Sequence, residues 1–344
     1  MYITRRHYDA AVSGSGTDPT AADALLARLE ADRQNRPHFN VYHIAYYAGA
    51  MFALAEMAIL LGNFWHDLTG LQISLIALIF GGFFGALGAY FWRLGPHARI
   101  PAGLFIALAA GLTPLFVLGV QRDFGVPVAN YAGQYHTLAQ WLHGGWFAME
   151  AVTLLAAGGV LYRLKIPLLT VLIGVTLWLA AMDLTAITFG EDTTRNDHRL
   201  VSAIFGAGLL ICAYATDLKQ RRGDFAFWLY LLGLLAFSGG LTALDSPSEG
   251  AKLVYCLVHL ALIALAGFLR RIMFVVFGAL GVGVYLAHLA RKVFRDELLF
   301  PLALAMLGAA IIAGALFAYR RRAALAAWVD RQIPERLKRF RPPA

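Results

Sequence analysis

The chain has 344 residues, of which 59% are hydrophobic and 15% are charged, whereas soluble globular domains carry about 25% charged residues. This composition excludes an ordinary soluble domain, and the two cysteines, Cys212 and Cys256, do not support a disulfide framework. Lys and Arg outnumber Asp and Glu by 29 to 21, but no basic motif interleaved with aromatic residues points to nucleic-acid binding.

Residues 1–42 form a polar N-terminal segment without the apolar stretch of a signal peptide, so no cleaved leader is expected. Within this segment, residues 17–34 predict a short amphipathic helix, because Leu25, Leu26 and Leu29 fall on one helical face. We expect residues 1–42 to be a cytoplasmic part of the chain that precedes the membrane domain.

Residues 43–319 consist mainly of apolar segments about 20 residues long, separated by short connectors. A helix of about 20 apolar residues crosses the hydrocarbon core of a bilayer, because each residue rises about 1.5 Å. The pattern predicts an all-α, polytopic transmembrane helix bundle with the lipid bilayer as its partner. The ten predicted spans cover residues 43–63, 70–92, 101–121, 141–162, 166–189, 199–218, 224–244, 250–269, 272–290 and 297–319.

Two connectors and the interior of one span show where these helices break. Residues 163–167 predict a tight basic hairpin, with Pro167 where the next helix can start. Residues 269–272 contain no strong turn residue, yet we interpret them as a second hairpin, because one continuous helix would be about twice the length that a bilayer needs. A continuous helix there would invert the orientation of the last span. Gly111 and Pro114 predict a kink in the middle of the third span.

Most of the Lys and Arg residues lie in alternate connectors and at the two ends of the chain. Cytoplasmic loops of membrane proteins are enriched in these residues, so the distribution predicts that both termini are cytoplasmic, in a bacterial inner membrane. Residues 320–344 then form a basic cytoplasmic tail. Either this tail docks on anionic lipid headgroups, or its Arg cluster is a topogenic stop signal followed by a solvated tail.

Several ionisable side chains lie at membrane depth in the predicted spans. A charge at the bilayer centre costs about 2.5–3.5 kcal/mol, so such residues normally face the bundle interior and have partners. Glu56, Glu150 and His259 are expected near the middle of their spans, and Asp183 in the outer half of its span. Further ionisable residues near the outer ends are His143, Asp245, Glu249, Lys252 and His288. These depths are compatible with one polar cavity that faces outward.

Carboxyl groups beside His or Lys side chains in such a cavity can exchange protons. The favoured prediction is therefore a transporter or an ion- or proton-permeation protein, and not an enzyme. Glu150 and Asp183 are the first candidates for its proton or cation site. The same side chains could instead form interhelical hydrogen bonds and ion pairs that fix the register of the helices.

A membrane-embedded metal- or haem-binding enzyme is the alternative hypothesis. His143, Glu150, Asp183 and His259 include suitable metal ligands, and the two histidines could flank a haem. The sequence has no HExxH or paired-histidine motif and no nucleophile signature, so no cofactor is predicted. The outer loop at 190–199 could bind a divalent cation or a polar substrate head group, although its charges suit a solvated, salt-bridged loop better. A non-catalytic membrane subunit or an assembly factor also stays open.

Three features of the first part of the chain carry a resemblance. They are YYAGAMFALAEMAILLGNFW (Tyr46–Trp65) after a polar N-terminal helix, a Gly-rich second span, and PAGLFIALAAGLTPLFVLGVQ (Pro101–Gln121). In these features residues 44–125 resemble an uncharacterised class of bacterial predicted multi-pass membrane proteins. That class has no activity to carry over, so the resemblance implies only the membrane assignment.

Overall fold

The computed structural model describes seven stretches of the chain and isolated residues elsewhere. The stretches are residues 68–95, 98–126, 137–190, 193–219, 225–245, 248–269 and 271–293. Their helices all belong to one unit, Tyr46–Ala344. The predicted helix at 17–34 and the basic tail at 320–344 lie outside the described stretches. So do the predicted spans 43–63 and 297–319, apart from isolated residues.

Eight helical segments in these stretches are long and apolar enough to cross a membrane. They coincide with the second to ninth predicted spans, with ends that differ by a few residues. The chain is therefore an all-helical, multi-pass integral membrane protein across the part that the structure describes. The total of ten spans and the cytoplasmic position of the termini stay predictions.

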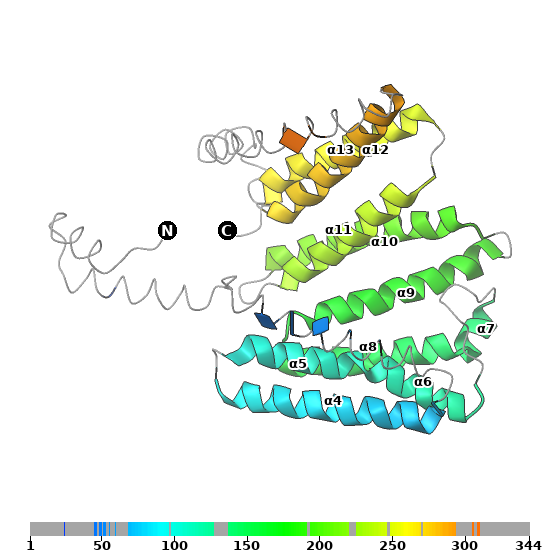
Figure 1. The fold of residues 1–344 in the computed structure, drawn as a ribbon, viewed down its shortest axis with the longest axis vertical. Coiled ribbons are helices and arrows are strands. Elements are labelled where there is room, and N and C mark those ends of the chain that lie inside the picture. The colour runs from blue at the N-terminus through cyan, green and yellow to red at the C-terminus, as the bar shows by residue number, and fades with distance from the viewer. Residues whose placement is uncertain are drawn as a thin grey trace. The chain divides into compact units, whose positions relative to one another are not determined.

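The helices follow one another in chain order, from α4 to the pair α12 and α13 (Figure 1). Their bounds are α4 Gly70–Arg93, α5 Arg99–Gly111, α6 Thr113–Asp123, α7 Leu138–His143, α8 Gly145–Leu164, α9 Leu169–Phe189, α10 Arg195–Lys219, α11 Phe225–Ala243, α12 Glu249–Leu269 and α13 Ile272–Val293. The short helix α7 lies between the spans that contain α6 and α8. The third span is divided between α5 and α6.

The break in the third span falls where Gly111 and Pro114 predict a kink. Helix α5 ends at Gly111, Leu112 forms a turn, and α6 begins at Thr113 with Pro114 in its first turn. The Leu112 N–H donates to Ala109 O, three residues earlier, at 3.3 Å. Pro114 cannot donate a backbone hydrogen bond, so the regular helical ladder stops at this position. The predicted kink is confirmed.

Both predicted hairpins are present in the structure. After α8, Lys165 adopts the left-handed conformation (φ 52°), and Pro167 lies in the turn that leads into α9. Helices α12 and α13 are separate and pack along each other. A Cβ atom added to Gly278 would meet the backbone of Ile263, and one added to Gly281 would overlap the ring of His259. The short connector at 269–272 is therefore a helical hairpin, as predicted.

Close helix packing depends on glycine at several other crossings. A Cβ atom on Gly119 would overlap Ser74 and the backbone of Gly70, where α6 crosses α4. On α10, a Cβ atom on Gly206 would overlap the backbone of Phe237 on α11. Small residues at such positions let helix backbones approach closely, which is how membrane bundles gain contact energy without a hydrophobic driving force between helices.

Successive spans run in opposite directions, so the charged residues at their ends gather at two ends of the bundle. We call one of these the basic end, where α4, α8, α10 and α12 finish. Among the described residues it carries one acid, Asp217, against six basic residues. These are Arg93, Arg99, Arg163, Lys165, Lys219 and Arg271. The other end is called the opposite end below.

Candidate functional site: a buried carboxyl pair on α8 and α9

Glu150 and Asp183 lie on two neighbouring spans that pack against each other, α8 and α9. Glu150 is five residues from the start of α8 and Asp183 is six residues from the end of α9. At about 1.5 Å per residue, both carboxyl groups lie about 8–9 Å below the opposite end. They lie at a similar depth on packed helices, and Asp183 is within electrostatic range of Glu150.

The depth of Glu150 differs from the sequence prediction. We predicted a span at 141–162 with Glu150 near its middle, but α8 begins only at Gly145. Residues 138–143 form the separate helix α7, and Gly144 between the two helices has an extended backbone (ψ 154°). Glu150 therefore lies in the second turn of its span. Asp183 lies in the predicted outer half of its helix.

Both acidic side chains are withdrawn from the surface of the protein. Glu150 is 4% exposed and Asp183 is 0% exposed. The indole N–H of Trp141 on α7 is close enough to act on the Glu150 carboxyl group. Even so, neither the Trp141 nitrogen nor the two Glu150 oxygens reach hydrogen-bond geometry with a described residue. Trp141 is held by an edge-to-face contact with Phe147 of α8, with ring centroids 4.9 Å apart.

Other polar side chains near the pair donate hydrogen bonds to backbone carbonyl groups. Gln121 of α6 donates to Gly145 O at 3.0 Å and so links α6 to the start of α8. Thr153, one turn after Glu150, donates to Met149 O at 2.6 Å, and Thr185 donates to Ala181 O at 2.8 Å. Such hydroxyl groups satisfy the carbonyls of their own helix. The hydroxyl groups of Thr153 and Thr185 therefore do not donate to the two carboxyl groups.

The two predicted histidines lie on different helix pairs. His143 is exposed at the end of α7, where its Nδ1 contacts Ala139 O at 2.8 Å. His259 is 0% exposed on α12 and packs against Gly281 of α13. Its Nδ1 lies 2.8 Å from Tyr255 O, and because a carbonyl only accepts, this nitrogen carries the proton. The buried Nε2 makes no hydrogen bond to a described residue. Helices α7 and α12 are not one of the packed helix pairs.

The remaining predicted residues form ion pairs at the opposite end. Asp245 accepts from Arg199 at 2.6 Å. Glu249 pairs with Lys252 at 3.1 Å and lies 3.7 Å from His288 Nε2. The two acids are exposed, whereas their basic partners are partly buried, an arrangement typical of ion pairs at the surface of a protein. Glu56 lies outside the described residues. The structure thus brings Glu150 and Asp183 together and places the other predicted residues elsewhere.

A second buried polar group lies at the basic end, and the sequence analysis did not identify it. Asp217 of α10 accepts two hydrogen bonds from Arg271, from Nη2 at 2.6 Å and from Nε at 3.2 Å. The Arg271 guanidinium also lies 5.9 Å from the ring centre of Tyr230, which packs edge-to-face on Phe274. The available signal was an acid in the last turn of a span, next to a connector rich in basic residues.

No protein-family model, curated protein or solved structure matches this chain. Within the described stretches, no group of three or more His, Cys, Asp or Glu side chains is arranged to hold a metal ion. The site is therefore interpreted from its own geometry, as two carboxyl groups and an indole between adjacent membrane-spanning helices.

Proposed function

We propose that this membrane protein moves protons or a small cation across the bilayer, with Glu150 and Asp183 as the binding pair. The observation that carries the proposal is that two acidic side chains are buried at a similar depth on two spans that pack against each other. Ionisable residues inside membrane helices are costly and typically mark ion pathways or proton relays.

The chemistry of the pair supports a proton or a cation as its ligand. Two carboxylates that share a site of low dielectric repel each other, and a bound proton or cation relieves this repulsion. The influences on Glu150 are burial, Asp183 and Trp141, and none of these brings a positive charge. Binding and release of one cation or proton would therefore change the charge of the pair.

A purely structural role supplies a weaker account of Glu150. Polar side chains that fix helix register donate to or accept from a partner across the interface. Both Glu150 oxygens are buried and accept no hydrogen bond of good geometry from a described residue. An amide substitution at Glu150 therefore breaks no hydrogen bond to a described residue, so it should disturb transport more than folding.

The test is a flux measurement with purified protein in liposomes that contain a pH-sensitive dye. A potassium diffusion potential drives protons, and separate arms use sodium and potassium gradients. We expect Glu150→Gln and Asp183→Asn each to lower the flux by about tenfold or more, because each removes a charge at the proposed site. The pH dependence of the remaining flux should change as well.

The matched control is Glu249→Gln, which makes the same chemical change on an exposed side chain at the opposite end. This variant should keep the flux of the unchanged protein. Melting temperatures of all variants show whether they fold. A folded protein without flux in any arm contradicts the proposal, and so does a Glu150→Gln or Asp183→Asn variant with unchanged flux.

A further inference from the structure

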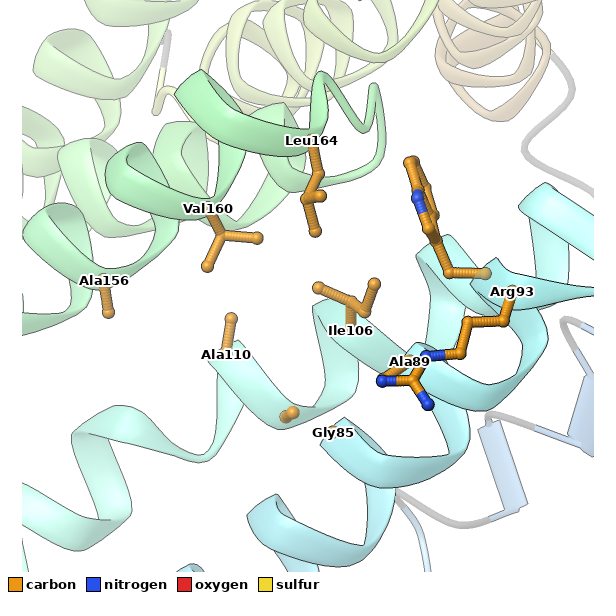
Figure 2. Close-up of a pocket in the computed structure, with 10 residues that line it drawn as sticks. Gly85, Ala89, Arg93, Ile106, Ala110, Ala156, Val160 and Leu164 are labelled. Carbon is orange, nitrogen blue, oxygen red and sulfur yellow. The ribbon is translucent and has the colours of Figure 1, made fainter.

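An apolar pocket of about 450 Å³ lies between α4, α5 and α8 (Figure 2). Its volume falls in the range of about 300–1,000 Å³ that is usual for small-molecule sites. Gly85 and Ala89 of α4, Ala110 of α5 and Ala156 of α8 contribute to its wall, and among the described residues that line it Arg93 alone is charged. The pocket is distinct from the carboxyl pair, which lies toward the opposite end.

The pocket is hollow because small residues recur one helical turn apart. Gly85 and Ala89 follow each other on one face of α4, and Ala156 takes the corresponding position on α8, followed by Val160 and Leu164. Figure 2 shows Val160 and Leu164 facing Ile106 and Ala110 across the space. Atoms that line an empty space lose their dispersion contacts, so a hollow within a bilayer favours an apolar occupant.

The length and direction of the pocket match one acyl chain. It extends along α4 from Gly85 to Arg93 and along α8 from Ala156 to Leu164. The first and last residues of each stretch are about 12 Å apart along the helix axis, and one leaflet has a hydrocarbon thickness of about 15 Å. The Arg93 and Leu164 ends of both helices lie at the basic end. A chain in this pocket therefore belongs to the leaflet on that side.

The rim of the pocket at the basic end is positively charged. Arg93, Arg99, Arg163 and Lys165 lie there, at the ends of the three helices that form the pocket. Arg99 Cζ lies 5.7 Å from the ring centre of Trp92, a pocket residue. Within the described part of the chain, Arg93, Arg163 and Lys165 form no ion pair.

The sequence around this rim contains no acid that could neutralise it locally. No Asp or Glu occurs from Gly70 to Arg122, or from Ala151 to Met182. The positive end of the α5 dipole also lies at this rim, and its N-cap residue, Ala98, has no side chain that could cap it. Basic residues at the membrane surface attract anionic lipids by about 1 kcal/mol each.

We propose that this pocket binds one acyl chain of an anionic phospholipid whose phosphate group pairs with Arg93 and the neighbouring basic residues. The apolar wall selects a lipid chain, and the basic rim selects a negatively charged headgroup. The lipid site does not rest on the proposed transport function: it shares α8 with the carboxyl pair but lies at the other end of that helix.

The test measures lipid binding to the full-length protein by native mass spectrometry. The protein, in a neutral detergent, is titrated with phosphatidylglycerol and, separately, with phosphatidylcholine that has the same acyl chains. We expect tighter binding of phosphatidylglycerol. Ala156→Phe, which fills the pocket, should raise its Kd by about tenfold or more. Arg93→Gln should remove the preference over phosphatidylcholine and keep residual binding of both lipids.

Two control variants introduce the same residue types, Phe and Gln, at positions away from the pocket. Leu155→Phe adds a ring one residue along α8, on a side chain that is exposed and does not line the pocket. Arg195→Gln removes a basic charge at the opposite end. Both should bind lipid as the unchanged protein does. Ala89→Phe fills the pocket from α4 and replaces Ala156→Phe if that variant does not fold.

Three results would overturn the proposal. Equal affinity for the two lipids would contradict the role of the basic rim, and unchanged binding by both pocket-filling variants would place the lipid elsewhere. A disulfide between Ala156→Cys and a single cysteine introduced into residues 43–63, formed equally with and without phosphatidylglycerol, would show that the chain itself occupies the pocket. Lipid-dependent protection of Ala156→Cys from a thiol reagent supports it.

Discussion

Two ion pairs of this protein have the same length and different surroundings. The Arg271–Asp217 and Arg199–Asp245 pairs both have an N–O distance of 2.6 Å. The Asp217 side chain is 5% exposed, however, and that of Asp245 is 80% exposed. Water screens the exposed pair, whereas a buried charge that loses its partner keeps its full desolvation cost. The distance alone therefore does not rank the two pairs.

We expect Arg271→Ala to lower the free energy of unfolding by about 3–5 kcal/mol, because it leaves the Asp217 carboxylate buried without its guanidinium partner. The double variant Asp217→Ala/Arg271→Ala should recover part of this loss, since it removes both charges. Arg199→Ala, the matched change in the exposed pair, should cost about 1 kcal/mol or less. Unfolding in a graded mixture of mild and denaturing detergents measures these differences. Equal losses for both single variants would contradict the role of burial.

At the scale of helices, packing depends on which glycines lie at a crossing. Gly206 and Gly208 are two residues apart on α10 and have opposite surroundings. A Cβ atom on Gly206 would overlap the backbone of Phe237, whereas one on Gly208 would meet nothing within 4 Å. The backbone of α11 cannot give way as a flexible side chain can, so the two helices must separate to admit a methyl group at Gly206.

Gly206→Ala should therefore destabilise the protein by about 1–3 kcal/mol through overpacking. Gly208→Ala should leave stability unchanged or raise it by about 0.5–1 kcal/mol, because alanine loses less conformational freedom in a helix than glycine does. Thermal unfolding of the two single variants in the same detergent measures the contrast. Loss of stability by Gly208→Ala as large as that of Gly206→Ala would show that close approach is not the cause.

The spans could be predicted from the sequence because the thickness of the bilayer sets their length, and each apolar stretch supplies that length. The depth of Glu150 could not be predicted in this way, because an apolar stretch does not show that one helix ends at His143 and the next begins at Gly145. Its proximity to Asp183 depends on how α8 and α9 are rotated about their axes. Rotation follows from side-chain packing and not from hydropathy. Asp217 was missed for the same reason, since its sequence neighbours suggest an exposed helix end.

At the scale of the whole molecule, the two ends of the bundle differ in charge. Six described basic residues and one acid, Asp217, lie at the basic end. The opposite end carries as many described basic residues, Arg122, Arg195, Arg199, Lys252, Arg291 and Lys292, but they are accompanied by several acids, among them Asp123, Asp245 and Glu249. Lys and Arg in short loops are retained on the cytoplasmic side during membrane insertion, and acids have little influence. Most of the other Lys and Arg residues of the sequence lie in the two chain ends, which the ten predicted spans place on the side of the basic end. The basic end is therefore expected to face the cytoplasm.

Leu94 and Phe124 allow a direct test of this orientation, because they flank the broken span formed by α5 and α6 at its two ends. Both are exposed, Leu94 at 45% and Phe124 at 81%, and each follows the last residue of a helix. In a protein whose own cysteines are replaced by alanine, we expect Phe124→Cys to react with an impermeant maleimide on intact cells. Leu94→Cys should react only after the cells are opened. The reverse pattern would place the basic end outside. Labelling of both positions from one side would mean that α5 and α6 together do not cross the bilayer.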